Sequence, residues 1–253
     1  MVHAFGHQLL NRSLVLVLCS TAMLVSTATN LTLASPRPSP KAVIPFTSFG
    51  FGDVYRGEII SQIFVIRNEG DADLQMGEFT AGCGCEVTRS DKVIPPGKEG
   101  SATLEVHTVS DSGAISKTAT LHTNDPARPA IIFTLAANII DGAPTRQGLR
   151  IGPVFLSPGP RSALYALAGK KATAEFSVSA EGVPVKVLRV EGGTNHFTSR
   201  VEVVEPGKTY RIVVESLPTD VAELYRDQIR VMTDSAYLAA FPIDLALRVY
   251  PRQ

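Results

Sequence analysis

Short stretches in which apolar and polar residues alternate recur along the first half of the chain. They cover residues 59–67, 74–80, 86–90, 101–107, 117–122 and 130–136. Clusters of Asn, Asp, Gly, Ser and Pro separate them, at 68–71, 95–97, 110–113 and 124–126. Alternation with a period of two is typical of strands that bury one face, and these breaker residues are typical of turns. The pattern therefore predicts seven or so short strands and an all-β fold.

A weak internal repeat divides the chain. Val93-Ile-Pro-Pro-Gly-Lys98 has a counterpart in Val203-Val-Glu-Pro-Gly-Lys208, and Thr123-Asn has one in Thr233-Asp, in each case 110 residues further on. Two landmarks in one order and at one spacing favour two homologous domains over one large fold. We predict two tandem immunoglobulin-like β-sandwich domains, at 43–141 and 142–253, with a hinge at 141–145. We also expect one helical turn at 219–225, capped by Thr219 or Asp220.

The N-terminus has the features of an export signal. His3, His7 and Arg12 precede an uncharged stretch, and small residues offer cleavage sites after Ala28 or Ala34. The strongly apolar run is about 12 residues, whereas a helix that spans a bilayer needs about 20. We predict a cleaved signal peptide at 1–34, a Pro-rich spacer at 35–42 and no integral membrane span after cleavage. The alternatives are an uncleaved anchor and lipidation at Cys19, although Leu18 lacks the small side chain that a lipobox needs.

Composition narrows the function classes. The 253 residues include 24 Lys and Arg and 24 Asp and Glu, so the net charge is zero, and no run of like charge stands out. A nucleic-acid partner is therefore not expected. Export places the mature chain in the periplasm, the extracellular space or the cell envelope, where disulfides persist.

Several short motifs occur in an order that resembles a known family. They are Phe49-Gly-Phe-Gly-Asp-Val54, Gly57-Glu58, Phe64, Asn68-Glu-Gly70, Cys83-Gly-Cys85, Pro96-Gly97 and Thr123-Asn-Asp-Pro126. Over about 43–140 the chain resembles the bacterial domain-of-unknown-function 1573 family, an exported immunoglobulin-like sandwich similar to ASH domains. The second domain resembles a diverged copy, with Thr194-Asn-His196 near the place of the cysteines. The resemblance implies the fold and export, and it carries no known activity.

The pair Cys83 and Cys85, separated by Gly84, is the one candidate for chemistry. The two side chains could simply fill one end of the sandwich, with Gly84 in a bend that needs a positive φ. They could form a strained and reactive disulfide across a very short ring. They could also hold copper or zinc, with His107 as a third ligand. A count of strand directions places the tripeptide beside the loop 110–115, so that His107 and Asp111 could converge on it.

No catalytic motif accompanies this pair. The sequence has no His-Glu-x-x-His, no Gly-x-Ser-x-Gly and no phosphate loop, so we expect no catalytic residues and no cofactor. Gly84, Pro96, Gly97, Asn124, Asp125 and Pro126 are interpreted as structural turn residues. The sequence thus predicts a non-enzymatic binding or scaffold protein of the cell envelope, with an unidentified protein partner. The alternative is a thiol-redox or copper-handling protein that uses Cys83 and Cys85.

Overall fold

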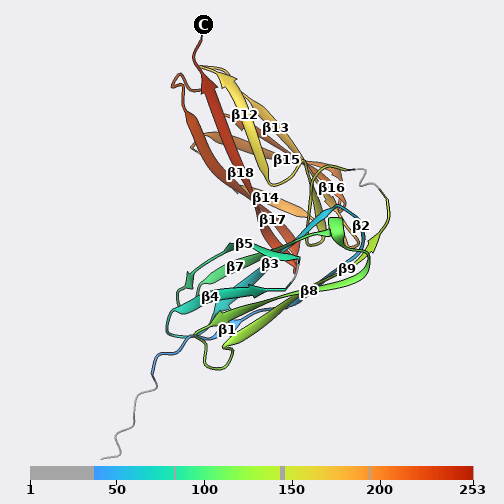
Figure 1. The fold of residues 1–253 in the computed structure, drawn as a ribbon. Helices are drawn as coiled ribbons and strands as arrows, with labels where there is room; N and C mark the ends of the chain where they lie inside the picture. Colours follow the sequence, from blue (N-terminus) through green and yellow to red (C-terminus); the bar gives the residue numbers. More distant parts are fainter. Residues whose placement is uncertain (1–36, 83, 143–145, 194, 253) are drawn as a thin grey trace, which may run out of the picture. The chain divides into compact units, whose positions relative to one another are not determined.

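The structure is a computed structural model that describes residues 37–82, 84–142, 146–193 and 195–252. Within these ranges the chain is built from strands, with one short 3-10 turn at Thr108–Ser110 (Figure 1). The predicted all-β immunoglobulin-like fold is confirmed. The predicted helical turn at 219–225 is wrong, because the segment has no helix and β17 begins at Leu224. Thr219 caps a tight turn there instead, and its hydroxyl accepts from the Val221 N–H at 3.2 Å.

The first half forms two packed sheets. One sheet contains β3, β7 and β5, with β1 on its edge, and the other has the order β2-β9-β8-β4-β6. Every neighbouring pair is antiparallel except β2 and β9, which are parallel. The strands are β1 (Ala42–Val43), β2 (Ser48–Tyr55), β3 (Ile59–Asn68), β4 (Leu74–Ala81), β5 (Cys85–Ser90), β6 (Val93–Ile94), β7 (Glu99–His107), β8 (Gly113–Thr123) and β9 (Ala130–Ile140).

The second half repeats this pairing scheme. β13, β16 and β15 correspond to β3, β7 and β5, and the sheet β12-β18-β17-β14 corresponds to β2-β9-β8-β4. The pair β12 and β18 is again parallel. The strands are β10 (Leu149–Ile151), β11 (Val154–Ser157), β12 (Arg161–Leu167), β13 (Thr173–Ala180), β14 (Val187–Gly192), β15 (Phe197–Glu205), β16 (Thr209–Ser216), β17 (Leu224–Ser235) and β18 (Leu238–Tyr250).

The turns repeat as well, at the spacing that the sequence gives. Gly97 and Gly207 have φ values of +71° and +74°. The Asp125 N–H donates to the Thr123 hydroxyl at 3.1 Å, and the Ser235 N–H donates to the Thr233 hydroxyl at 3.2 Å. The internal repeat in the sequence therefore corresponds to a repeat of strand order and turn geometry.

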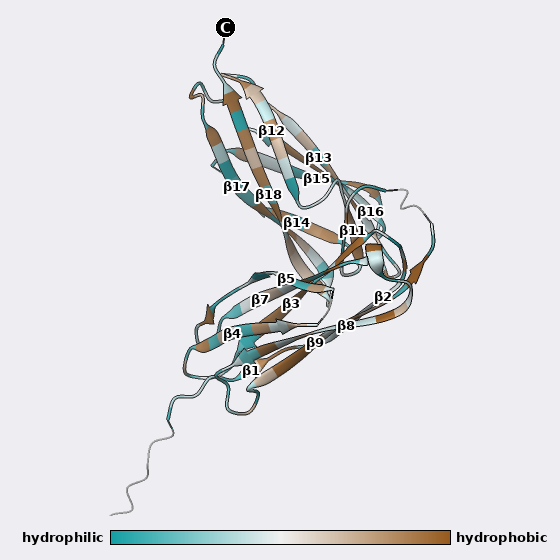
Figure 2. Cartoon of the chain, in the orientation of Figure 1, coloured by the Kyte–Doolittle hydropathy of each residue, from teal (hydrophilic) through white to brown (hydrophobic). Residues whose placement is uncertain are grey.

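Alternating side chains build one hydrophobic core in each half. Along β9, for example, Ile131, Phe133 and Leu135 are buried while Ala130 and Ile132 are exposed. Figure 2 shows hydrophilic and hydrophobic residues following one another along individual strands. One cluster of buried residues runs from Ala42 to Ile139 and the other from Ile151 to Val249. Each half thus buries its own apolar face between two sheets.

A continuous sheet joins the two halves. After the connecting segment, β10 pairs in parallel with β3, with Arg150 opposite Ile60 and Ile151 opposite Ser61. The resulting sheet has the order β15-β16-β13-β11-β10-β3-β7-β5. The sequence suggests a hinge at 141–145, of which 143–145 lie outside the described residues. The backbone pairing that follows it is a feature that the hinge prediction did not include.

Candidate functional site

The turn between β4 and β5 carries the cysteine tripeptide, and Cys83 itself lies outside the described residues. The Gly82 N–H donates to the Thr118 carbonyl at 2.8 Å, and the Cys85 N–H donates back to the Gly82 carbonyl at 3.2 Å. Gly84 has a φ of +81°, which side chains of L-residues rarely adopt. A glycine is therefore needed at this bend for backbone reasons alone.

Cys85 points into the core of the first half. It is 9% exposed, belongs to the core cluster and is paired with the buried Val106 on β7. Burial raises the pKa of its thiol, and the nearby positive charge of Lys117 opposes this rise only in part. A thiol with a raised pKa is a weak nucleophile and a weak metal ligand at neutral pH. Cys85 thus has the properties of a packing residue.

A partly buried ion pair lies beside the tripeptide. Lys117 on β8 donates to Asp111 at 2.7 Å, and their side chains are 18% and 14% exposed. A Cβ atom on Gly84 would come within 3.0 Å of the Lys117 Nζ atom. The loop 110–115 thus lies next to the tripeptide, as the count of strand directions predicts. Lys117 was not identified from the sequence, because a lone lysine in a strand carries no motif.

His107 is turned away from Cys85. On β7 the buried residues are Leu104 and Val106, so Glu105 and His107 project from the opposite face of the sheet. The His107 Nε2 atom lies 3.1 Å from a carboxylate oxygen of Glu105. The alternative of a metal site with Cys83, Cys85 and His107 as ligands is therefore wrong at His107. The His107 ring and the Cys85 thiol lie on opposite faces of one sheet.

The second half contains a direct counterpart of this turn. Cys85 pairs with Val106, and Phe197 pairs with Ser216, the residue 110 positions after Val106. The Phe197 N–H donates to Gly193 at 2.7 Å, in the manner of Cys85 and Gly82. Phe197 is 2% exposed. At equivalent positions the two halves thus bury a thiol and a phenyl ring, which supports packing as the role of Cys85.

The other turn residues tie one end of the first half together. The buried Asp125 carboxylate accepts from the Ala42 and Ala127 N–H groups, both at 2.8 Å. Asn124 accepts from the Gln75 N–H at 2.8 Å. Pro96 and Gly97 form the turn before β7, and Pro126 forms the turn before β9. These contacts are structural, since each of them holds the end of a strand.

The junction between the halves buries two polar side chains, Arg150 and Gln62, that no sequence motif marks. The Arg150 guanidinium, 8% exposed, donates to the Phe51 carbonyl at 2.5 Å and to the Asp53 carbonyl at 3.0 Å. The fully buried Gln62 amide donates to the Tyr237 carbonyl at 2.7 Å. Arg150 and Gln62 carry hydrogen bonds between the two halves, so replacing either would remove donors from backbone carbonyls at the junction.

The outward face of the sheet β12-β18-β17 presents large apolar and cationic side chains. Arg248 lies between Tyr165 on β12 and Leu224 on β17. Tyr165, Leu167, Leu224 and Tyr250 are 64%, 53%, 42% and 47% exposed. Tyr165 and Tyr250 stack with ring centroids 6.5 Å apart. We name this surface, made of Tyr165, Leu167, Leu224, Arg226, Arg248 and Tyr250, the tyrosine–arginine face.

A shallow hollow adjoins this face. Its volume is about 560 Å³, and Arg161, Arg226 and Asp244 are among the residues that line it. Neither Arg226 nor Arg248 forms an ion pair with another described residue. Tyrosine and arginine are enriched among the residues that contribute most of the binding energy in protein interfaces. The sequence indicates the strands that form the hollow and the face, through alternating apolar and polar residues, but no motif marks either surface.

Within the four described ranges no three His, Cys, Asp or Glu side chains are grouped so that they could hold a metal ion. In the same ranges no helix has the length and apolar character needed to cross a membrane.

The pairing of strands defines the class as an immunoglobulin-like β-sandwich. Residues 44–139 match the family described as Protein of unknown function (DUF1573). The chain matches no curated protein.

The chain is similar to several solved structures at low sequence identity. A protein of unknown function from Porphyromonas gingivalis W83 is 12% identical, with 82% of this chain and 99% of that one covered and a TM-score of 0.34. The ASH/PapD-like domain 7 of human CEP192 is 13% identical, with coverage of 43% and 92% and a TM-score of 0.36. The titin I-band fragment I67–I69 is 14% identical, with coverage of 84% and 66% and a TM-score of 0.27.

Proposed function

We propose that the chain is an exported, non-enzymatic binding protein of the bacterial cell envelope. Its partner is a protein that presents carboxylates to the tyrosine–arginine face. The leader at 1–34 supports export, and its length of apolar sequence supports cleavage rather than anchoring. The observation that carries the proposed binding function is the set of exposed tyrosine and leucine side chains around Arg226 and Arg248.

The composition of this face favours a protein over other partners. The tyrosine and leucine side chains provide apolar surface that is desolvated on binding. The two arginines provide positive charge and planar hydrogen-bond donors for carboxylates. A membrane would select lysine and arginine clusters in larger number, and the chain has no net positive charge. An acidic protein surface is the partner that satisfies both the apolar and the cationic parts of the face.

The thiol-redox and copper alternative receives no support from Cys85, whose thiol is buried in the core. Because Cys83 lies outside the described residues, a disulfide between Cys83 and Cys85 stays a prediction.

Charge reversal on the face tests the proposal. In cells that make the protein natively, brief formaldehyde treatment should give a complex of fixed mass that contains this chain and an acidic protein. The double variant R226E/R248E should reduce the yield of that complex at least about tenfold, because two like-charge contacts replace two attractive ones. Circular dichroism of the variant should be unchanged, since both side chains are exposed.

The matched control is R67E/R128E, which makes the same change of charge at two exposed arginines of the first half. The control should leave the complex intact. An equal loss in both double variants, or a product that contains lipid and no second protein, would contradict the proposed function.

A further inference from the structure

The strand β15 lies at one end of the nine-stranded sheet. It pairs with β16 along its whole length, from Phe197 opposite Ser216 to Glu205 opposite Thr209. Among the described strands it has no neighbour on its other side. An edge strand of this length presents backbone donors and acceptors to any strand that can lie against it.

One printed contact fixes which backbone groups face outward. The Leu217 N–H donates to the His196 carbonyl at 2.7 Å, so His196 directs its carbonyl toward the β16 side. In an antiparallel ladder this direction alternates along the strand. Thr198, Arg200 and Glu202 therefore bond to β16, whereas Ser199, Val201 and Val203 direct their N–H and C=O groups to the open edge.

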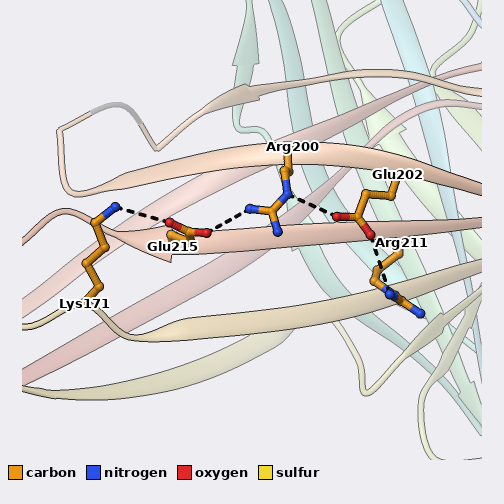
Figure 3. Close-up of polar contacts among 5 residues, drawn as sticks. All are labelled: Lys171, Arg200, Glu202, Arg211 and Glu215. Atoms are coloured by element: carbon orange, nitrogen blue, oxygen red, sulfur yellow. Dashed lines mark hydrogen bonds and ion pairs between the residues drawn. The ribbon is translucent and has the colours of Figure 1, made fainter.

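The side chains on the outward face of β15 carry opposite charges at close spacing. Figure 3 shows Arg200 and Glu202 within a row of ion pairs. Glu215 accepts from Arg200 at 2.8 Å and lies 3.4 Å from Lys171, while Arg200 lies 3.1 Å from Glu202. The Glu202 carboxylate lies 3.6 Å from Arg211. The row holds Arg200 and Glu202 at the edge of the sheet, where a further strand would meet them.

The sequence of this edge is complementary to itself in one register. If a second β15 pairs in antiparallel fashion about Val201, Arg200 lies opposite Glu202 of the second copy, and Glu202 lies opposite Arg200 of the second copy. Centring the pair on Arg200 or on Glu202 would place like charges opposite each other. Centring it on Ser199 or Val203 would place no opposite charges together.

The register about Val201 also satisfies the backbone. Val201 would face Val201 of the second copy, and Ser199 would face Val203, all with outward N–H and C=O groups that can bond to each other. Arg200 and Glu202 then form the non-hydrogen-bonded pairs, in which opposing side chains approach most closely. The exposed Val203, at 60%, would lie diagonal to Val201 of the second copy. The bulge between Val203 and Glu205 ends the usable edge.

We propose that two copies of this chain associate through antiparallel pairing of their β15 strands about Val201, with reciprocal Arg200–Glu202 ion pairs. The contact involves one short strand from each copy, so the dimer is weak and forms at high local concentration. This surface is separate from the tyrosine–arginine face, and the proposal does not depend on the partner that binds there.

Disulfide trapping distinguishes this register from others. The variants R200C and E202C are made in the full exported chain, mixed in equal amounts and oxidised gently, and the linked peptides are identified by mass spectrometry. In the proposed pairing, position 200 lies directly opposite position 202 of the second copy, at a spacing that suits a disulfide. Two copies of position 200 lie only diagonally, about 7–8 Å apart.

The mixed 200–202 product should therefore exceed each homodimeric product several-fold, instead of the twofold excess that random collision gives. V183C, mixed with E202C, is the control, because Val183 is exposed but lies outside β15. Products in statistical proportion, a dominant 200–200 or 202–202 product, or no linked product would overturn the proposal. A link between position 202 and a different protein would also overturn it by assigning the edge to another occupant.

Discussion

Replacing Cys85 separates packing from chemistry at the cysteine tripeptide. The side chain is 9% exposed and lies among core residues, so Cys85→Ala removes one buried atom and leaves a small cavity. We expect a loss of about 1–2 kcal/mol in the free energy of unfolding. Cys85→Ser keeps the size but buries a hydroxyl in apolar surroundings, and should cost about 2–4 kcal/mol. Cys85→Val is similar in volume and should cost less than about 1.5 kcal/mol.

The assay is urea unfolding followed by far-ultraviolet circular dichroism, with and without reductant. Packing predicts the stability order wild type, valine, alanine, serine, and the same order in both conditions. Cys83→Ala, which leaves the Cys85 thiol in place, is the control for loss of a disulfide. If serine were tolerated as well as valine, or if every variant fell by the same amount only without reductant, the packing role of Cys85 would be wrong.

The pH dependence of the same variants gives a second check. Burial raises the pKa of Cys85 above its ordinary value of 9.0, with Lys117 opposing the rise. The folded state therefore holds the thiol proton more tightly than the unfolded state does, and stability is lost as the pH rises from about 9 through the folded pKa. Between pH 8 and pH 10.5 the wild type should lose more stability than Cys85→Val. Equal slopes would mean that Cys85 is accessible to water.

Three further predictions concern structural contacts. Asp125→Ala should lower the free energy of unfolding by about 2–3 kcal/mol in urea titrations, because the buried Ala42 N–H loses its acceptor. Arg150→Met should cost about 2–4 kcal/mol in the same assay, because two carbonyls at the junction lose a charged donor. The hydrogen bond from Arg200, followed by the one from Lys171, lowers the pKa of Glu215. The contribution of Glu215 to stability is therefore present above pH 4.5 and is lost as the pH falls through the folded pKa. In carboxylate NMR titrations, Arg200→Ala should return the pKa of Glu215 toward 4.5.

Much of the fold could be predicted from alternation and turn residues. The stretch 59–67 became β3 and 130–136 became the middle of β9, since each has enough consecutive alternating positions to define a buried face. β2 was missed as a strand. Gly50 and Gly52 interrupt its apolar pattern, Gly52 has a φ of +67°, and a bulge shifts its register against β9. Glycine has a low strand propensity, so the pairing of β2 with β9 is apparent only in the structure.

The site was predictable in position but not in orientation. Strand counting placed the loop with Asp111 beside the tripeptide, because antiparallel neighbours alternate in direction. The side of the sheet from which His107 projects depends on the register of β7 against β3 and β5, which no single strand reveals. The role of the buried Arg150 could not be predicted from the sequence either, because its hydrogen-bond partners are backbone carbonyls about 97–99 residues away in the chain.

Photo-crosslinking from the tyrosine–arginine face tests directly whether this face binds a protein partner. A photoreactive phenylalanine derivative replaces Tyr165, which is 64% exposed, in the exported chain within living cells. The matched control carries the same group in place of Tyr55, which is 40% exposed and lies on β2 in the first half. We predict one discrete adduct with an acidic protein from position 165, diminished by R226E/R248E, and none from position 55. Equal labelling from both positions, or an adduct from 165 that R226E/R248E does not diminish, would show that the tyrosine–arginine face is not the binding surface.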